Sequence, residues 1–168
     1  MFVAFEDGEF HLESEFQNSW GGAMFIWNTL IDKHKVPGAK HPWGDEGDAY
    51  KNLWKLPQET FKPWEWNALN STYDNVVVTR EHMLVIAESL EMFEEAHGSP
   101  NRVCSLKAQA KAIREHHKAG AIAIAWNQTS VCGDPFCGSK YDEETDTYIP
   151  YNIKTGDNHW EFEAVALK

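Results

Sequence analysis

The feature that most constrains the fold is a short apolar run over 121–126 that follows a glycine and ends abruptly in polar residues. Every position of the run Ala-Ile-Ala-Ile-Ala-Trp is apolar. This pattern is typical of a strand that is buried on both faces, because a strand with one face in solvent alternates apolar and polar residues. We therefore expect 121–126 to form the centre of a β-sheet.

Other segments supply further strands. Residues 2–13 alternate apolar and polar side chains around Asp7-Gly8, which predicts a hairpin. The β-branched run 75–78 is separated from 121–126 by two helical segments, so the two strands should pair in antiparallel orientation. In the tail, aromatic and apolar residues at 141–151 and 160–166 predict two or three more strands that close the sheet. Antiparallel pairing disfavours a doubly wound nucleotide-binding fold.

Three helices are predicted from apolar residues spaced three and four apart. The first begins at a Ser-x-x-Gln capping box at Ser14 and ends before Pro37, although Gly21 and Gly22 leave a later start equally open. The others are expected over 79–95 and 105–118, each with a hydroxyl side chain in the capping position.

The segment 37–71 contains four prolines and four tryptophans and shows neither helical nor strand periodicity. We predict a long irregular segment there, which wraps the core as a lid or an arm because so much aromatic surface would not lie free in solvent. The whole chain, 1–168, is then a single α+β domain with a mostly antiparallel sheet packed with about three helices.

Charge and composition exclude several classes of function. The 15 Lys and Arg residues against 26 Asp and Glu residues give a net charge of −11, which repels phosphate backbones, so we expect no general nucleic-acid binding. The start lacks the basic and apolar regions of an export signal, and no apolar stretch reaches the roughly 18 residues that span a bilayer. We expect a cytoplasmic protein with no membrane role and with its three cysteines as thiols.

Sequence motifs for phosphate loops, dinucleotide binding, nucleophile elbows and zinc proteases are absent. Cys132 and Cys137 could offer two thiolates to zinc, with His116, His117 or His159 as further ligands, but the same residues fit a simple Gly/Pro turn. We predict no metal, no cofactor and no assigned catalytic residue. If the chain is an enzyme, His116 and His117 are the candidates for a titrating group.

The candidate ligand-binding site is the polar end of the central strand. Trp126 is followed there by four hydrogen-bonding side chains, Asn127, Gln128, Thr129 and Ser130. A planar polar ligand could stack on the indole while the amides and hydroxyls bind its edges. The alternative is a strand end whose side chains cap neighbouring backbone groups.

Arg80 could add a charged contact, because it lies just inside a helix start, where a phosphate or carboxylate is attracted. It could equally pair with Glu81 or a carboxylate of the tail. Antiparallel strand pairing would also place Arg80 and Asn127 at opposite edges of the sheet.

The sequence resembles short uncharacterised proteins of bacterial viruses and their hosts over roughly 74–160. The resemblance is carried by 126–131 with Asp134-Pro135-Phe136, by 76–81 upstream and by 141–145 downstream. It brings no known activity or catalytic residue. What it implies is a viral context, in which small proteins often counter host enzymes or host signalling.

We therefore expect a non-enzymatic viral protein that sequesters a small polar or nucleotide-like molecule and counters host defence signalling. One alternative is an inhibitor that presents an acidic face, including Glu88, Glu91, Glu94 and Glu95, to a basic host protein. Another is a small enzyme that uses a His/carboxylate pair. An oligomer is compatible with each hypothesis.

Overall fold

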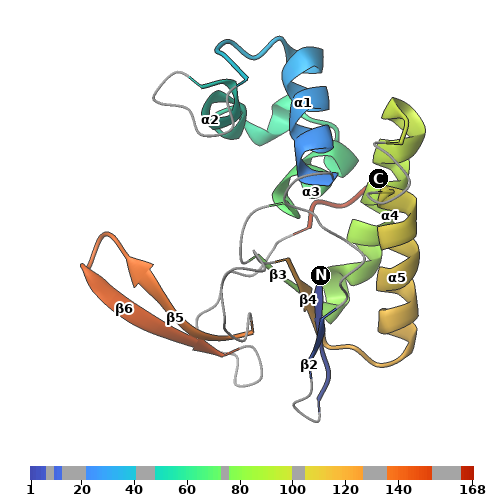
Figure 1. The fold of residues 1–168 in the computed structure, drawn as a ribbon, viewed down its shortest axis with the longest axis vertical. Helices are drawn as coiled ribbons and strands as arrows, with labels where there is room; N and C mark the ends of the chain where they lie inside the picture. Colours follow the sequence, from blue (N-terminus) through green and yellow to red (C-terminus); the bar gives the residue numbers. More distant parts are fainter. Residues whose placement is uncertain are drawn as a thin grey trace.

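A four-stranded antiparallel sheet lies at the centre of the computed structural model of the chain (Figure 1). The structure describes residues 1–6, 10–12, 22–40, 48–72, 76–99, 105–126, 136–152 and 164–168. The sheet has the order β2-β1-β4-β3 and contains β1 (Phe2–Ala4), β2 (Phe10–Leu12), β3 (Val77–Thr79) and β4 (Ala123–Ala125).

The predicted centre of the sheet is confirmed, because β4 pairs with β1 on one side and with β3 on the other. Ile124 lies between Val3 and Val78, and all three belong to the main hydrophobic core, which the helices share. The opposite face carries a smaller buried cluster made of Phe2, Ala4, Val77, Ala123, Ala125 and Phe136. Both faces of β4 are thus covered, which explains why its sequence is apolar at every position.

The described part of the chain contains five α-helices and one short 3₁₀ helix. They are α1 (Ala23–His34), α2 (Ala49–Trp54), the 3₁₀ helix η2 (Gln58–Thr60), α3 (Pro63–Asn70), α4 (Arg80–His97) and α5 (Leu106–Lys118). The three predicted helices correspond to α1, α4 and α5. Helix α1 starts at Ala23, the later of the two predicted starts, whereas the capping box at Ser14 lies outside the described residues.

The prediction that 37–71 is irregular is wrong for most of its described residues, which form α2, η2 and α3. Asp48 caps α2 by accepting a hydrogen bond from the Tyr50 backbone N–H, and Pro63 occupies the first turn of α3. The segment is part of the core and not a cover over it, since Leu53, Trp64 and other side chains are buried there. Helices of six and eight residues contain too few turns to show a clear sequence period.

The prediction that strands of the tail close the sheet is also wrong. Strands β5 (Cys137–Asp142) and β6 (Thr147–Asn152) form a separate two-stranded antiparallel sheet. The two strands are joined by the short turn 143–146, so each satisfies the backbone of the other without reaching the central sheet. Residues 164–168 form no strand, and the rest of the last predicted strand lies outside the described residues.

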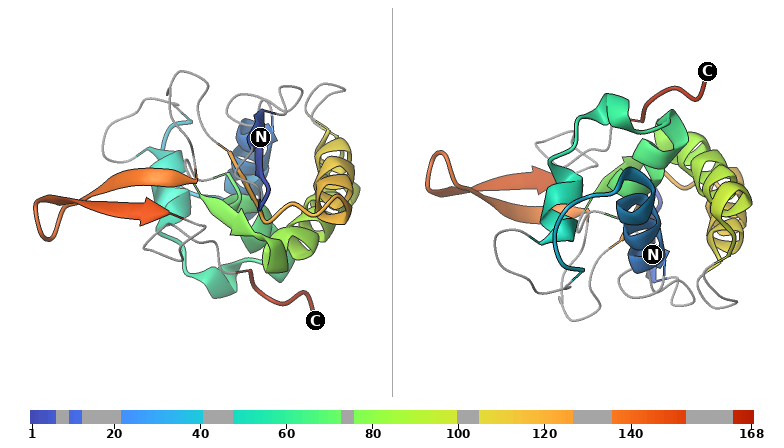
Figure 2. Two further views of the ribbon diagram at one scale, coloured as in Figure 1. Left: turned by 90° about the horizontal axis from the view of Figure 1, so that it is seen from below. Right: turned by 90° about the horizontal axis from the view of Figure 1, so that it is seen from above.

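The α+β class with antiparallel pairing is as predicted. Helices α4 and α5 lie side by side at one end of the molecule, and the β5–β6 hairpin extends from the opposite end (Figure 2). Within the described ranges, no helix is both long enough and apolar enough to cross a membrane.

Candidate functional site

Trp126 follows β4 directly, and its side chain is only 4% exposed. By continuation of the strand register it lies at the same end of the sheet as Met1 and Val76, which are buried in the same core cluster. The indole Nε1 is buried, and it has no hydrogen-bond partner among the residues that the structure describes. A buried N–H donor without an acceptor carries a cost of about 1–3 kcal/mol.

A second tryptophan, Trp27, has a hydrogen-bond acceptor for its indole N–H. Trp27 donates from Nε1 to the Thr72 hydroxyl at 2.7 Å. Its ring also contacts Tyr50 edge-on, with 5.7 Å between the ring centroids. Trp126 differs from Trp27 in that its indole N–H has no acceptor among the described residues.

The remaining residues of the predicted site, Asn127, Gln128, Thr129 and Ser130, lie outside the described residues. Their part in ligand binding therefore stays a prediction. The structure establishes only that the Trp126 side chain and its Nε1 are buried directly before this segment in the sequence.

Arg80 lies at the other end of the sheet. Its backbone N–H donates to the Ile122 carbonyl at 2.8 Å, four residues before Trp126 along β4, which corresponds to roughly 13 Å of extended strand. Its guanidinium donates to the carbonyls of His117 and Ala121 at 2.8 and 2.7 Å. Arg80 thus satisfies one carbonyl in the last turn of α5 and one just beyond the helix, and the structure does not bring it together with Trp126.

A buried charged cluster that the sequence analysis missed is centred on Glu65, whose side chain is 0% exposed. One carboxylate oxygen accepts from Lys33 Nζ at 2.5 Å and lies 3.3 Å from His97 Nε2. The other accepts from the Lys62 backbone N–H at 3.1 Å, as the residue at the third helical position of a capping box does. The cluster joins α1, α3 and α4.

The ionisation of Glu65 follows from these contacts. Burial alone would raise the pKa of Glu65, but the hydrogen bond from Lys33, the Lys62 backbone N–H, the charge of Lys33 and the contact with His97 together lower it. The pKa of the neighbouring His34 is lowered, because its burial and the Lys33 charge outweigh the opposing effect of Glu65. Glu65 is thus held as a carboxylate beside a cation.

The Glu65–His97 contact is a His/carboxylate pair of the kind that the enzyme hypothesis needs. The His97 ring, however, lies between Phe93 and Trp64, with centroid distances of 4.8 and 5.6 Å. The carboxylate is fully engaged by its partners, so the arrangement suits the joining of three helices better than proton transfer to a substrate. The one sequence signal for this cluster is an acidic residue three positions after Lys62 at a proline-started helix.

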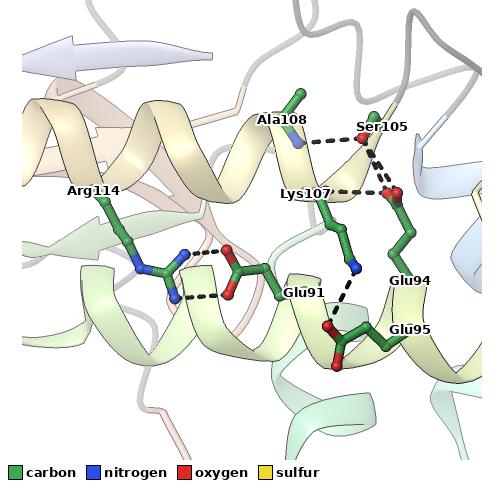
Figure 3. A network of polar contacts seen from close by, with 7 residues as sticks. All are labelled: Glu91, Glu94, Glu95, Ser105, Lys107, Ala108 and Arg114. Carbon is green, nitrogen blue, oxygen red and sulfur yellow. Dashed lines mark hydrogen bonds and ion pairs between the residues drawn. The ribbon is translucent and has the colours of Figure 1, made fainter.

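The acidic residues of α4 contact α5 (Figure 3). Glu91 forms a two-pronged ion pair with the guanidinium of Arg114, and Glu94 accepts from the Ser105 hydroxyl and the Lys107 backbone N–H. Glu95 lies 3.2 Å from Lys107 Nζ. Of the acidic face predicted to meet a basic protein, Glu88 alone has no partner of this kind among the described residues.

His116 and His117 lie in the last turn of α5, as predicted, and their carbonyls accept backbone hydrogen bonds that end the helix. Cys137 is the first residue of β5, whereas Cys132 and His159 lie outside the described residues. Across the described ranges, no group of three or more His, Cys, Asp or Glu side chains is placed to hold a metal ion.

Comparisons with protein families, with curated proteins and with solved structures found no significant match to the chain.

Proposed function

We propose that this protein binds a small polar or nucleotide-like molecule, without chemical conversion, at the end of β4 where Trp126 meets the segment 127–130. The observation that carries the proposal is the buried Trp126 Nε1–H, which has no acceptor among the described residues. A ligand with a carbonyl, phosphate or ring-nitrogen acceptor would complete this donor. In the viral context that the sequence resemblance implies, such capture would remove a host signalling molecule.

The position of Trp126 supports a binding role. Its ring belongs to the main core beside the central strand, so the donor is held rigidly and is already desolvated. A preformed donor of this kind costs little ordering entropy when a ligand arrives. The polar side chains that follow it in the sequence could then recognise the rest of the ligand.

The experiment is native mass spectrometry on the protein purified without denaturation, followed by extraction and identification of any bound molecule. A Trp126→Phe variant keeps an aromatic ring and removes the N–H donor. We expect the parent protein to retain a stoichiometric small molecule and the variant to bind the extracted molecule about 5- to 30-fold more weakly, the effect of losing one buried hydrogen bond.

Trp27→Phe is the matched control, because it makes the same change at an indole whose N–H already has the Thr72 hydroxyl as its acceptor. The control should be less stable than the parent and should still bind the extracted molecule with parental affinity. A parent protein that carries no small molecule, or equal loss of binding in both variants, would contradict the proposal.

A further inference from the structure

The β5–β6 hairpin extends away from the rest of the molecule in all three views (Figures 1 and 2). Most of its described side chains are exposed, although a two-stranded hairpin is only marginally stable by itself in water. It is also unusually rich in exposed aromatic surface. Tyr141 is 47% exposed and Tyr148 is 72% exposed, and these two tyrosines are two of the three exposed large hydrophobic residues in the described chain.

The hairpin has an ordered base and an ordered tip. At the base, Phe136 is 2% exposed and packs into the cluster on the outer face of the central sheet. At the tip, Asp142 accepts from the Glu144 backbone N–H at 2.9 Å, and the Tyr141 hydroxyl donates to Asp146. These local contacts hold the tip in one shape without packing against the body of the protein.

The exposed surface combines an aromatic pair with negative charge. Tyr141 and Tyr148 are opposite each other in the strand register, and their ring centroids are 5.4 Å apart. Residues 137–152 contain one lysine and four acidic residues, all four of them at 142–146. Aromatic faces attract cations, and a guanidinium can stack on a ring while its N–H groups bind carboxylates.

We propose that this hairpin is a docking arm for a basic protein surface that presents arginine side chains. An arginine of the partner stacks on the Tyr141–Tyr148 pair, and the carboxylates of Glu143 and Glu144 bind neighbouring cations. The net charge of −11 on the whole chain favours the approach of a positively charged partner. This interaction does not depend on ligand capture at Trp126.

The test measures binding of a fluorescein-labelled peptide of alternating arginine and serine to the full chain, by fluorescence anisotropy at physiological ionic strength. A lysine–serine peptide of the same length and charge is the comparison. We expect the arginine peptide to bind more tightly than the lysine peptide. Tyr148→Ala should weaken binding of the arginine peptide about two- to fivefold, while Leu84→Ala, which removes another exposed apolar side chain, leaves it unchanged.

The contribution of charge is tested with two matched double variants. Glu143→Gln with Glu144→Gln should weaken binding of the arginine peptide about threefold, whereas Glu59→Gln with Glu88→Gln should change it much less, although each removes two exposed carboxylates. Circular dichroism checks that every variant is folded, which is expected because all these side chains are exposed.

Three outcomes overturn the proposal. The first is no binding of the arginine peptide by the parent protein. The second is equal weakening by the two double variants, which shows attraction by net charge alone. The third is a dimer in sedimentation velocity that dissociates on Tyr148→Ala, because the hairpin would then be an interface between two copies of this chain.

Discussion

Glu65 keeps a charge in the interior of the fold, and its contribution to stability can be measured. In Glu65→Gln the ammonium of Lys33 and the ring of His97 lose their carboxylate partner. We expect the free energy of unfolding at neutral pH to fall by about 2 kcal/mol, from urea denaturation followed by circular dichroism. Glu59→Gln, at an exposed site, should change it by less than about 0.5 kcal/mol. Equal stability of the two variants would show that the buried cluster contributes nothing.

The Glu65 contribution should depend on pH in a defined direction. The pKa of Glu65 lies below its ordinary value of 4.5, so the folded protein binds fewer protons than the unfolded chain does. The stabilisation is therefore present above pH 4.5 and is lost as the pH falls through the folded pKa. The difference in unfolding free energy between the parent and Glu65→Gln should narrow below pH 4.5. A difference that stays constant across this range would contradict the assignment.

Protonation of His34 should affect the stability of the protein in a different pH range from that of Glu65. Its Nε2 is buried, and no described residue offers it a hydrogen bond, while burial and the Lys33 charge lower its pKa from 6.5. The folded state then resists protonation, so the parent should lose stability as the pH falls from 6.5 through the folded pKa. His34→Gln should lack this loss, as measured by urea denaturation across the same range. If the free energy of unfolding depends on pH in the same way in the parent and in His34→Gln, this account of His34 is wrong.

At the scale of elements, the contact between α4 and α5 includes the two-pronged Glu91–Arg114 pair (Figure 3). The two side chains are 34% and 39% exposed, so solvent screens the pair. A double-mutant cycle with Glu91→Ala and Arg114→Ala should give a coupling energy of about 0.5–1 kcal/mol that decreases in high salt. The pair Lys111–Glu115, more exposed and at 3.8 Å, is the control and should give less. A larger coupling in the control would contradict this ranking.

How well the sequence predicts an element depends on how much of its environment is local. The central strand and its antiparallel neighbour are predictable, because burial on both faces requires apolar residues throughout 121–126. Helices α2 and α3 are not, since six and eight residues contain too few turns to show a clear helical period. The sequence also does not predict that β5 and β6 form a sheet of their own, because an alternating pattern does not specify which strand each one pairs with.

At the scale of the whole molecule, the sites formed by distant residues are the hardest to predict. Lys33, Glu65 and His97 lie on three different helices and meet only when those helices pack. Trp126, in contrast, directly follows β4 in the sequence, and its burial could be predicted from the apolar strand before it. Arg80 is a weaker candidate for that site, because the antiparallel pairing of β3 with β4 places it at the opposite end of β4.

The last described segment of the chain, 164–168, packs Ala164 and Leu167 against the core and is hydrogen-bonded to it by one buried side chain. The amide of Asn67 in α3 donates to the Ser89 hydroxyl and the Val165 carbonyl and accepts from the Val165 backbone N–H, at 3.1, 2.9 and 2.9 Å. Asn67→Ala removes all three bonds and should lower the free energy of unfolding by about 3 kcal/mol. Asn70→Ala removes only a bond to Trp66 within the same helix and should cost about 1 kcal/mol or less.

Hydrogen exchange distinguishes loss of this connection from general destabilisation. In Asn67→Ala the Val165 amide should exchange far faster than in the parent, while amides in the middle of α4 should exchange faster only in proportion to the loss of global stability. Unchanged protection at Val165 would mean that other contacts hold the segment in place. Asn67 also donates to Ser89 on α4, so the variant loses that hydrogen bond as well. Faster exchange at Val165 alone would show that the terminal segment opens separately from α4.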